Sequence, residues 1–130
     1  MRVSVVILYK SRKYLILITR VKENKQYDVL PGGQIEDGES SLNAAIREIK
    51  EELAIEMNAS DTIDSLNYED YCLFVVKTKR TIGPLTIDGE ELQRSHSNNR
   101  YHPRWIIVED SRKMTIFPEF DFDLVNQVIN

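Results

Sequence analysis

Cysteine is nearly absent from this chain of 130 residues, and so is any long apolar segment. Cys72 is the only cysteine, which excludes an internal disulfide and fits a reducing, cytoplasmic compartment. The opening apolar run, Val3–Tyr9, is much shorter than the roughly 20 apolar residues that a membrane span needs, and no cleavage site follows it. We therefore expect a cytoplasmic protein with no membrane segment and no signal peptide, and with Cys72 as a buried, inert thiol.

An excess of basic residues is also missing, because 17 Lys and Arg face 21 Asp and Glu and the formal net charge is −4. This balance argues against a general nucleic-acid binder. An acidic protein repels polyphosphates, so any phosphate chemistry here needs bridging cations. The short basic run Lys77–Arg80 is most simply a solvated turn, with contact to a substrate phosphate as the alternative. The hydrophobic share of 42% and the length predict one globular domain over residues 1–130.

Apolar runs with β-branched residues predict strands along most of the chain. The predicted strands are Val3–Tyr9, Tyr14–Thr19, Tyr27–Leu30, Tyr71–Thr78 and Trp105–Val108. The first two would form a hairpin, and Pro31–Gly33 is expected to break regular structure. Residues 56–70 are expected to be loop with some strand, and residues 83–102 either a long irregular loop or a β-excursion.

Helical periodicity is clearest from Ser40 to Leu53, where apolar residues recur at the i, i+3, i+4 spacing of one buried stripe. Ser40 or Ser41 can cap this helix. A second amphipathic helix is predicted for Phe120–Ile129. Strands and helices in this order predict a layered α/β (α+β) domain.

Three glutamates share one face of the first predicted helix, since Glu48, Glu51 and Glu52 are separated by three and four residues. Like charges at this spacing repel each other, and only Lys50 is near enough to offset them. A hard divalent cation such as Mg²⁺ gains from the arrangement, because it prefers oxygen ligands and shares them with phosphate. Taken alone, the cluster would more simply be a solvated acidic face.

The wider pattern decides between these interpretations. Gly33, Glu39, Arg47, Glu48, Ile49, Glu51, Glu52 and Ile55 stand in the register of a known signature. This 23-residue stretch resembles the Nudix box: Gly, five residues, Glu, seven residues, then Arg-Glu-apolar-any-Glu-Glu-any-Gly-apolar. Ala54 stands where the family has Gly, a position that favours positive φ at a helix end. We expect Ala54 to adopt that conformation at a cost of roughly 1 kcal/mol, or the helix to end differently, with activity retained in either case.

The resemblance implies a Nudix-type α/β/α sandwich around a mixed β-sheet. It implies an Mg²⁺- or Mn²⁺-dependent hydrolase that cuts the pyrophosphate bond of a nucleoside diphosphate-linked substrate. The implied catalytic residues are Glu51, Glu52 and Arg47; the implied metal ligands are Glu48, Glu51, Glu52 and a backbone carbonyl of Gly32 or Gly33. Arg47 would pair with Glu39 or Glu51 and hold the carboxylates in place.

The sequence leaves the identity of the general base open. Glu51 and Glu52 are candidates within the box, whereas Glu90 and Glu91 are candidates in the long loop. His96 and His102 could also reach a substrate. We favour Glu52 as a ligand and Glu51 as both ligand and base.

The substrate also stays open, and no substrate-binding residue is assigned. The aromatic residues available for base stacking are Tyr27, Tyr71, Phe74, Tyr101 and Phe117. The short chain favours a nucleoside triphosphate or an oxidised nucleotide, whereas the position of Tyr71 hints at diadenosine polyphosphates. We expect a monomer or homodimer that acts on a small nucleotide. The rival hypotheses are a non-catalytic nucleotide-binding Nudix domain that acts as a sensor or regulator, and a structural domain with an acidic helix.

Overall fold

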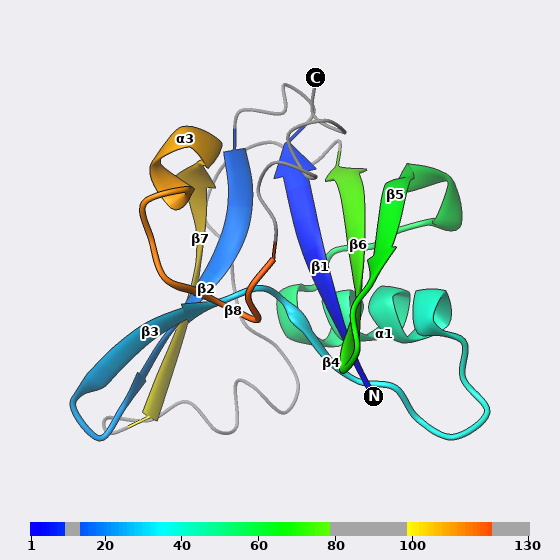
Figure 1. Cartoon of the computed structure of the whole chain (residues 1–130), viewed down its shortest axis with the longest axis horizontal. Coiled ribbons are helices and arrows are strands. Elements are labelled where there is room, and N and C mark those ends of the chain that lie inside the picture. The colour runs from blue at the N-terminus through cyan, green and yellow to red at the C-terminus, as the bar shows by residue number, and fades with distance from the viewer. Residues whose placement is uncertain (10–13, 79–98, 121–130) are drawn as a thin grey trace.

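The computed structural model describes residues 1–9, 14–78 and 99–120 (Figure 1). The strands are β1 (Arg2–Tyr9), β2 (Tyr14–Lys22), β3 (Lys25–Val29), β4 (Gly32–Gln34), β5 (Thr62–Asn67), β6 (Tyr71–Thr78), β7 (Asn99–Ile107) and β8 (Ile116–Phe117). The helices are α1 (Ser41–Leu53), the 3-10 turn η1 (Ala59–Asp61) and the short α3 (Val108–Ser111). All of these strands belong to one mixed sheet, which confirms the predicted α/β class.

The sheet consists of two groups of strands that diverge from each other. One group contains β5, β6, β1 and β4, with β1 and β6 parallel; the other contains β7, β2, β3 and β8. Among the described residues, β1 and β2 are in register only at Leu8 and Leu15, whereas β2 pairs with β7 from Tyr14 to Lys22. In Figure 1 the lower ends of the two groups therefore point apart, and α1 lies across the lower part of the β1 group.

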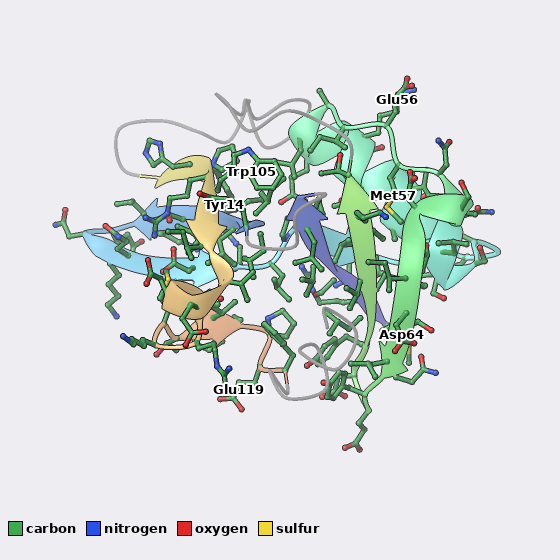
Figure 2. All side chains as sticks on the ribbon, turned by 90° about the horizontal axis from the view of Figure 1, so that it is seen from above. Tyr14, Glu56, Met57, Asp64, Trp105 and Glu119 are labelled. Atoms are coloured by element: carbon green, nitrogen blue, oxygen red, sulfur yellow. The ribbon has the colours of Figure 1, made fainter. Side chains whose placement is uncertain are left out.

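Alternating residues of the strands face two separate hydrophobic layers, as the period of a β-strand requires. Val3 and Ile16 pack with α1 in one layer, whereas Val6 and Leu15 pack in the other with Ile116. Figure 2 shows the two sides, because the labels of Met57 and Trp105 lie on the α1 side and that of Glu119 lies on the opposite side. The predicted apolar stripe of α1 is confirmed: Ala45, Ile49 and Leu53 are fully buried, and Leu42 and Ile46 pack against the same layer.

The two ends of α1 follow the sequence expectations. The side chain of Ser40 caps the helix, since its Oγ accepts a hydrogen bond from the backbone N–H of Asn43 at 3.1 Å. At the other end, Ala54 adopts the left-handed conformation with φ 56° and ψ 29°. Its N–H donates to the carbonyl of Lys50 at 3.0 Å. The chain therefore keeps the family's helix ending without the family's glycine.

Two predictions about the strands are wrong at particular residues. Gly32 and Gly33 do not interrupt regular structure, because Gly32–Gln34 forms β4 and pairs with β1. This close approach needs glycine, since a Cβ on Gly32 would lie 2.0 Å from the carbonyl oxygen of Val3. The strand predicted from Trp105 to Val108 instead begins at Asn99 and ends at Ile107, so the last four positions of residues 83–102 are strand, which agrees with the β-excursion rather than the loop.

Some expectations lie outside the described residues or need a smaller correction. The predicted helix over Phe120–Ile129 falls almost wholly on residues 121–130, which the structure does not describe. The region expected as loop with some strand, residues 56–70, contains β5, as expected, and also the 3-10 turn η1. Cys72 is half-buried rather than buried, with its Sγ 3.9 Å from Met1 Sδ. Across the described ranges, no helix has the length and apolar character needed to span a membrane.

Candidate active site

Arg47 is the centre of a hydrogen-bond network that ties helix α1 to the loop before it. Its Nε and Nη2 donate to the two carboxylate oxygens of Glu39 at 2.8 and 2.9 Å, and Nη2 also donates to the carbonyl of Gln34 at 3.0 Å. Its Nη1 donates to Glu48 at 3.0 Å and to Glu51 at 3.2 Å. These five bonds use every N–H donor of a guanidinium. The prediction that Arg47 pairs with Glu39 or Glu51 is confirmed for both residues.

The network has a clear effect on the protonation of Glu39. The hydrogen bond from Arg47 is the main cause that lowers the pKa of Glu39 to about 2, and the backbone N–H of Glu36 adds to it by donating to Oε1 at 3.1 Å. The same pair raises the pKa of Arg47. Both groups therefore stay charged from neutral pH down to strongly acidic conditions, and they hold the geometry of the helix and loop over that range.

Glu52 differs from the other two box glutamates in its burial. Only 7% of Glu52 is exposed, whereas the side chain of Glu51 is 57% exposed and that of Glu48 is 19% exposed. The backbone N–H of Gly32 donates to Glu52 Oε2 at 3.1 Å, which links the last turn of α1 to β4. A buried carboxylate needs such donors, because water does not solvate it. The acidic face predicted for this helix therefore consists of a buried Glu52, a half-buried Glu48 and an exposed Glu51.

Gly33 leaves room for the carboxylate of Glu48. A Cβ at position 33 would lie 2.3 to 2.5 Å from the three carboxylate atoms of that side chain. Real Cβ atoms do not approach so closely, so any other residue at this position would displace Glu48. The glycine of β4 therefore shapes the space in which this carboxylate lies.

These groups open onto one cavity with a volume of about 790 Å³, which is in the range of small-molecule sites. It spans the gap between the two groups of strands. From β1, β4, β6 and α1 come Arg2, Ser4, Gly32, Gly33, Gln34, Arg47, Glu48, Glu51, Glu52 and Tyr71; from β2, β3, β7 and β8 come Arg20, Val29, Tyr101 and Phe117; the adjoining Leu30, Glu36, Asp70 and Pro118 complete it. Every residue predicted as a catalytic group or metal ligand lies on its surface.

The donor chemistry of the cavity fits a hard divalent cation, although the described residues hold no ready group of three acidic, His or Cys ligands. Arg47 engages one oxygen each of Glu48 and Glu51, and the backbone N–H of Gly32 donates to Glu52. Carboxylate oxygens are the ligands that a hard divalent cation prefers. Together with the space beside Gly33, these carboxylates suit a cation that completes its shell with water and phosphate oxygens.

Other predicted site residues have mixed outcomes. Tyr71, Tyr101 and Phe117 line the cavity, whereas Phe74 lies in the core. The hydroxyl of Tyr71 donates to the carbonyl of Glu119, and burial is the main cause that raises its pKa. His102 is exposed on β7 and does not line the cavity. Glu90, Glu91 and His96 lie outside the described residues, as do Lys79 and Arg80 of the basic run.

Two cationic residues of the cavity were missed by the sequence analysis, namely Arg2 and Arg20. Arg2 is exposed at the start of β1. The sequence pattern could have identified Arg20. This residue continues the alternation of Ile16 and Ile18 on the face of β2 that packs toward α1. A charged residue in the buried phase of a strand is unusual and would have marked Arg20 as a candidate.

The sequence matches the model of the NUDIX domain over residues 1–114, and this match identifies the family of the chain. The chain belongs to the NUDIX family. It is a Nudix hydrolase, and enzymes of this type cleave pyrophosphate bonds of nucleotide substrates and generally use divalent metal ions. Among curated proteins, none matches the chain by sequence.

Solved structures of Nudix proteins share the fold of this Nudix hydrolase. One, from a study of MutT of Aliivibrio salmonicida and Vibrio cholerae, is 20% identical with a TM-score of 0.63, covering 98% of this chain and 94% of its own. The MutT protein of Methanosarcina mazei is 20% identical with a TM-score of 0.64, covering 98% and 90%. An Ap4A hydrolase of C. elegans is 20% identical with a TM-score of 0.56, covering 99% and 92%. At this identity the likeness establishes the fold.

Proposed function

We propose that this Nudix hydrolase cleaves the pyrophosphate bond of a nucleoside triphosphate or an oxidised nucleotide, with Mg²⁺ or Mn²⁺ held by Glu48, Glu51 and Glu52. One observation carries the proposal: the three box glutamates open into a cavity of about 790 Å³ that also has an aromatic wall. Such a cavity accommodates a nucleotide with its phosphates at the carboxylates and its base at the aromatic side.

The reaction is attack of water on a phosphorus atom, with rupture of the bond from that phosphorus to the bridging oxygen. A bound divalent cation supplies charge neutralisation and lowers the pKa of a coordinated water. Glu52 is buried and fixed by Gly32, which suits a ligand of constant position. Glu51 is the most exposed of the three, so it can accept the proton of the attacking water and return it to solvent. Arg47 positions Glu48 and Glu51 and has no donor left for the substrate.

Several properties accompany this proposal as predictions. We expect one domain over residues 1–130, a monomer or homodimer, and action on free nucleotides in the cytoplasm rather than on nucleic acid or membranes. The carbonyl of Gly32 or Gly33 remains the proposed backbone ligand. The rival function is a non-catalytic nucleotide-binding domain that acts as a sensor or regulator.

A hydrolysis screen tests the proposal. The protein is incubated with Mg²⁺ and nucleoside triphosphates, oxidised nucleotides, dinucleoside polyphosphates and nucleotide sugars, and the products are identified by mass. We expect a monophosphate and pyrophosphate from one triphosphate class, with turnover that chelation abolishes and that Glu52→Gln greatly reduces. Turnover of nucleotide sugars alone would refute the substrate class, and no turnover despite Mg²⁺ binding would favour the sensor.

A further inference from the structure

Arg20 lies in a row of aromatic side chains that crosses four strands. In the sheet register it stands opposite Tyr27 on β3 and opposite Tyr101 on β7. Its guanidinium carbon is 4.5 Å from the ring centroid of Tyr101 and 5.5 Å from that of Tyr27, both within cation–π range. The row continues to Phe117, whose ring meets that of Tyr27 edge-on at 6.4 Å.

The guanidinium of Arg20 has few polar partners. Its one hydrogen bond to a described residue goes from Nη2 to the hydroxyl of Tyr101 at 2.6 Å, and its buried Nε has no partner there. The ion pairs between described residues involve Arg47 and Arg104 and do not include it. Among the described residues, the guanidinium therefore has N–H donors without an acceptor, and the place of Arg20 on the cavity wall makes a ligand the natural source of one.

The position of Arg20 indicates which part of a nucleotide it meets. It lines the cavity from the β2 group of strands, together with Tyr101 and Phe117, whereas the box glutamates line the cavity from α1. The polyphosphate belongs beside the carboxylates and their cation. The planar base then lies on the aromatic side, where Phe117, 47% exposed, offers an apolar ring.

From this arrangement, and resting on the proposed function, we infer that Arg20 determines base specificity by donating hydrogen bonds to the acceptor edge of a keto base. A guanidinium fork matches a keto oxygen with an adjacent ring nitrogen acceptor, as in a 6-keto purine. An amino group at the same ring position would place a donor against a donor and would leave the guanidinium unpaired. The preferred class is therefore nucleotides of 6-keto purines over their 6-amino counterparts.

Product binding tests this inference without requiring turnover. Inosine and adenosine monophosphate differ only at the keto or amino edge, so their dissociation constants are compared by calorimetry in buffer with chelator. We expect about tenfold tighter binding of inosine monophosphate by the wild type, a modest value for a bidentate contact. Arg20→Met should bring the ratio of the two constants close to one, and Arg20→Lys should do the same, because a lysine lacks the planar fork.

Arg104→Met is the matched control. Arg104 lies on β7 but on the opposite face, where its Nε donates to Thr19 at 2.8 Å and its Nη2 pairs with Asp28 at 3.1 Å. This variant should lower the melting temperature and keep the preference for inosine monophosphate.

Three results would overturn the inference: equal binding of both nucleotides by the wild type, equal weakening of both by Arg20→Met, or no binding of either. Equal weakening would assign Arg20 to the phosphate or ribose that both ligands share. A failed hydrolysis screen beside an Arg20-dependent preference would overturn the proposed function alone. Turnover without a keto preference would overturn only the role of Arg20.

Discussion

Two arginines line the same cavity in opposite circumstances. Arg47, on the wall formed by α1, has all its donors engaged by carboxylates and a carbonyl. Arg20, on the wall formed by β2, has one hydrogen-bond partner among the described residues, a neutral phenol. A saturated cation holds structure, whereas an unsaturated cation at a cavity is available to a ligand. The proposed function therefore assigns chemistry to the acidic wall, which carries Glu48, Glu51 and Glu52, and base recognition to the aromatic wall, which carries Arg20, Tyr101 and Phe117.

The largest expected effect is a fall in kcat for a substitution on the acidic wall. Glu52→Gln should lower kcat by about a thousandfold, because loss of a ligand charge removes several kcal/mol of transition-state stabilisation. The amide can still accept from Gly32, so the fold and the binding of a nucleoside monophosphate should persist. Steady-state kinetics, a thermal melt and calorimetry check this, with the exposed Glu56→Gln as control. Near wild-type turnover would refute the role of Glu52.

A smaller kinetic effect is expected for Arg47→Lys. The lysine keeps the charge but cannot bridge Glu39, Glu48 and Glu51 at once, so kcat should fall roughly 10- to 100-fold. The Mg²⁺ concentration at half-maximal activity should also rise. Arg104→Lys, on the outer face of the sheet, is the control and should leave both values unchanged. Equal kinetics in the two variants would show that Arg47 does not position the carboxylates.

Phe117→Ala should act on the other wall. Loss of a stacking ring is expected to raise KM about tenfold while kcat stays within about twofold, because base stacking contributes roughly 1–3 kcal/mol whichever base is bound. Ile107→Ala is the matched control, since Ile107 is 46% exposed, as Phe117 is 47% exposed, but lies outside the cavity. A fall in kcat with unchanged KM would contradict the assignment of base binding to the aromatic wall.

Glu39→Gln gives a pH-dependent effect on stability. The pKa of Glu39 is lowered in the folded state from 4.5 to about 2, so its stabilising contribution is full above about pH 4.5 and is lost as the pH falls toward 2. The variant should melt below the wild type at pH 7, and the gap should close between these two pH values. Glu36→Gln is the control, because Glu36 is exposed at 3.7 Å from Arg47 and should matter little. A gap that persists at pH 2 would contradict the assignment.

The smallest effect is expected for Ala54→Gly. Glycine removes the steric cost of φ 56° at the end of α1, which should stabilise the fold by about 1 kcal/mol and raise Tm by roughly 3 °C. Activity should not change, since Ala54 does not line the cavity. A lower melting temperature would show that the entropy cost of glycine exceeds the strain of alanine here.

The two walls also differ in how far the sequence predicts them. The acidic wall lies within one contiguous stretch, so helical periodicity and box spacing are enough to identify α1, its Ser40 cap and the three glutamates. The aromatic wall joins Arg20, Tyr101 and Phe117 from β2, β7 and β8, which pairing between distant segments brings together. Local pattern carries no information about such pairing. The same reason explains why β4 was missed and why the sequence left residues 99–102 open between loop and strand.

The limited pairing between β1 and β2 has a consequence for how the site can change. Within the described residues, the ladders that carry the two walls are in register only at Leu8 and Leu15. On the proposed function, we expect substitutions on β2, β7 and β8 to alter base preference while the carboxylates on α1 stay in place. The divergence of the strands would then let the choice of substrate and the chemistry evolve separately within the same small fold.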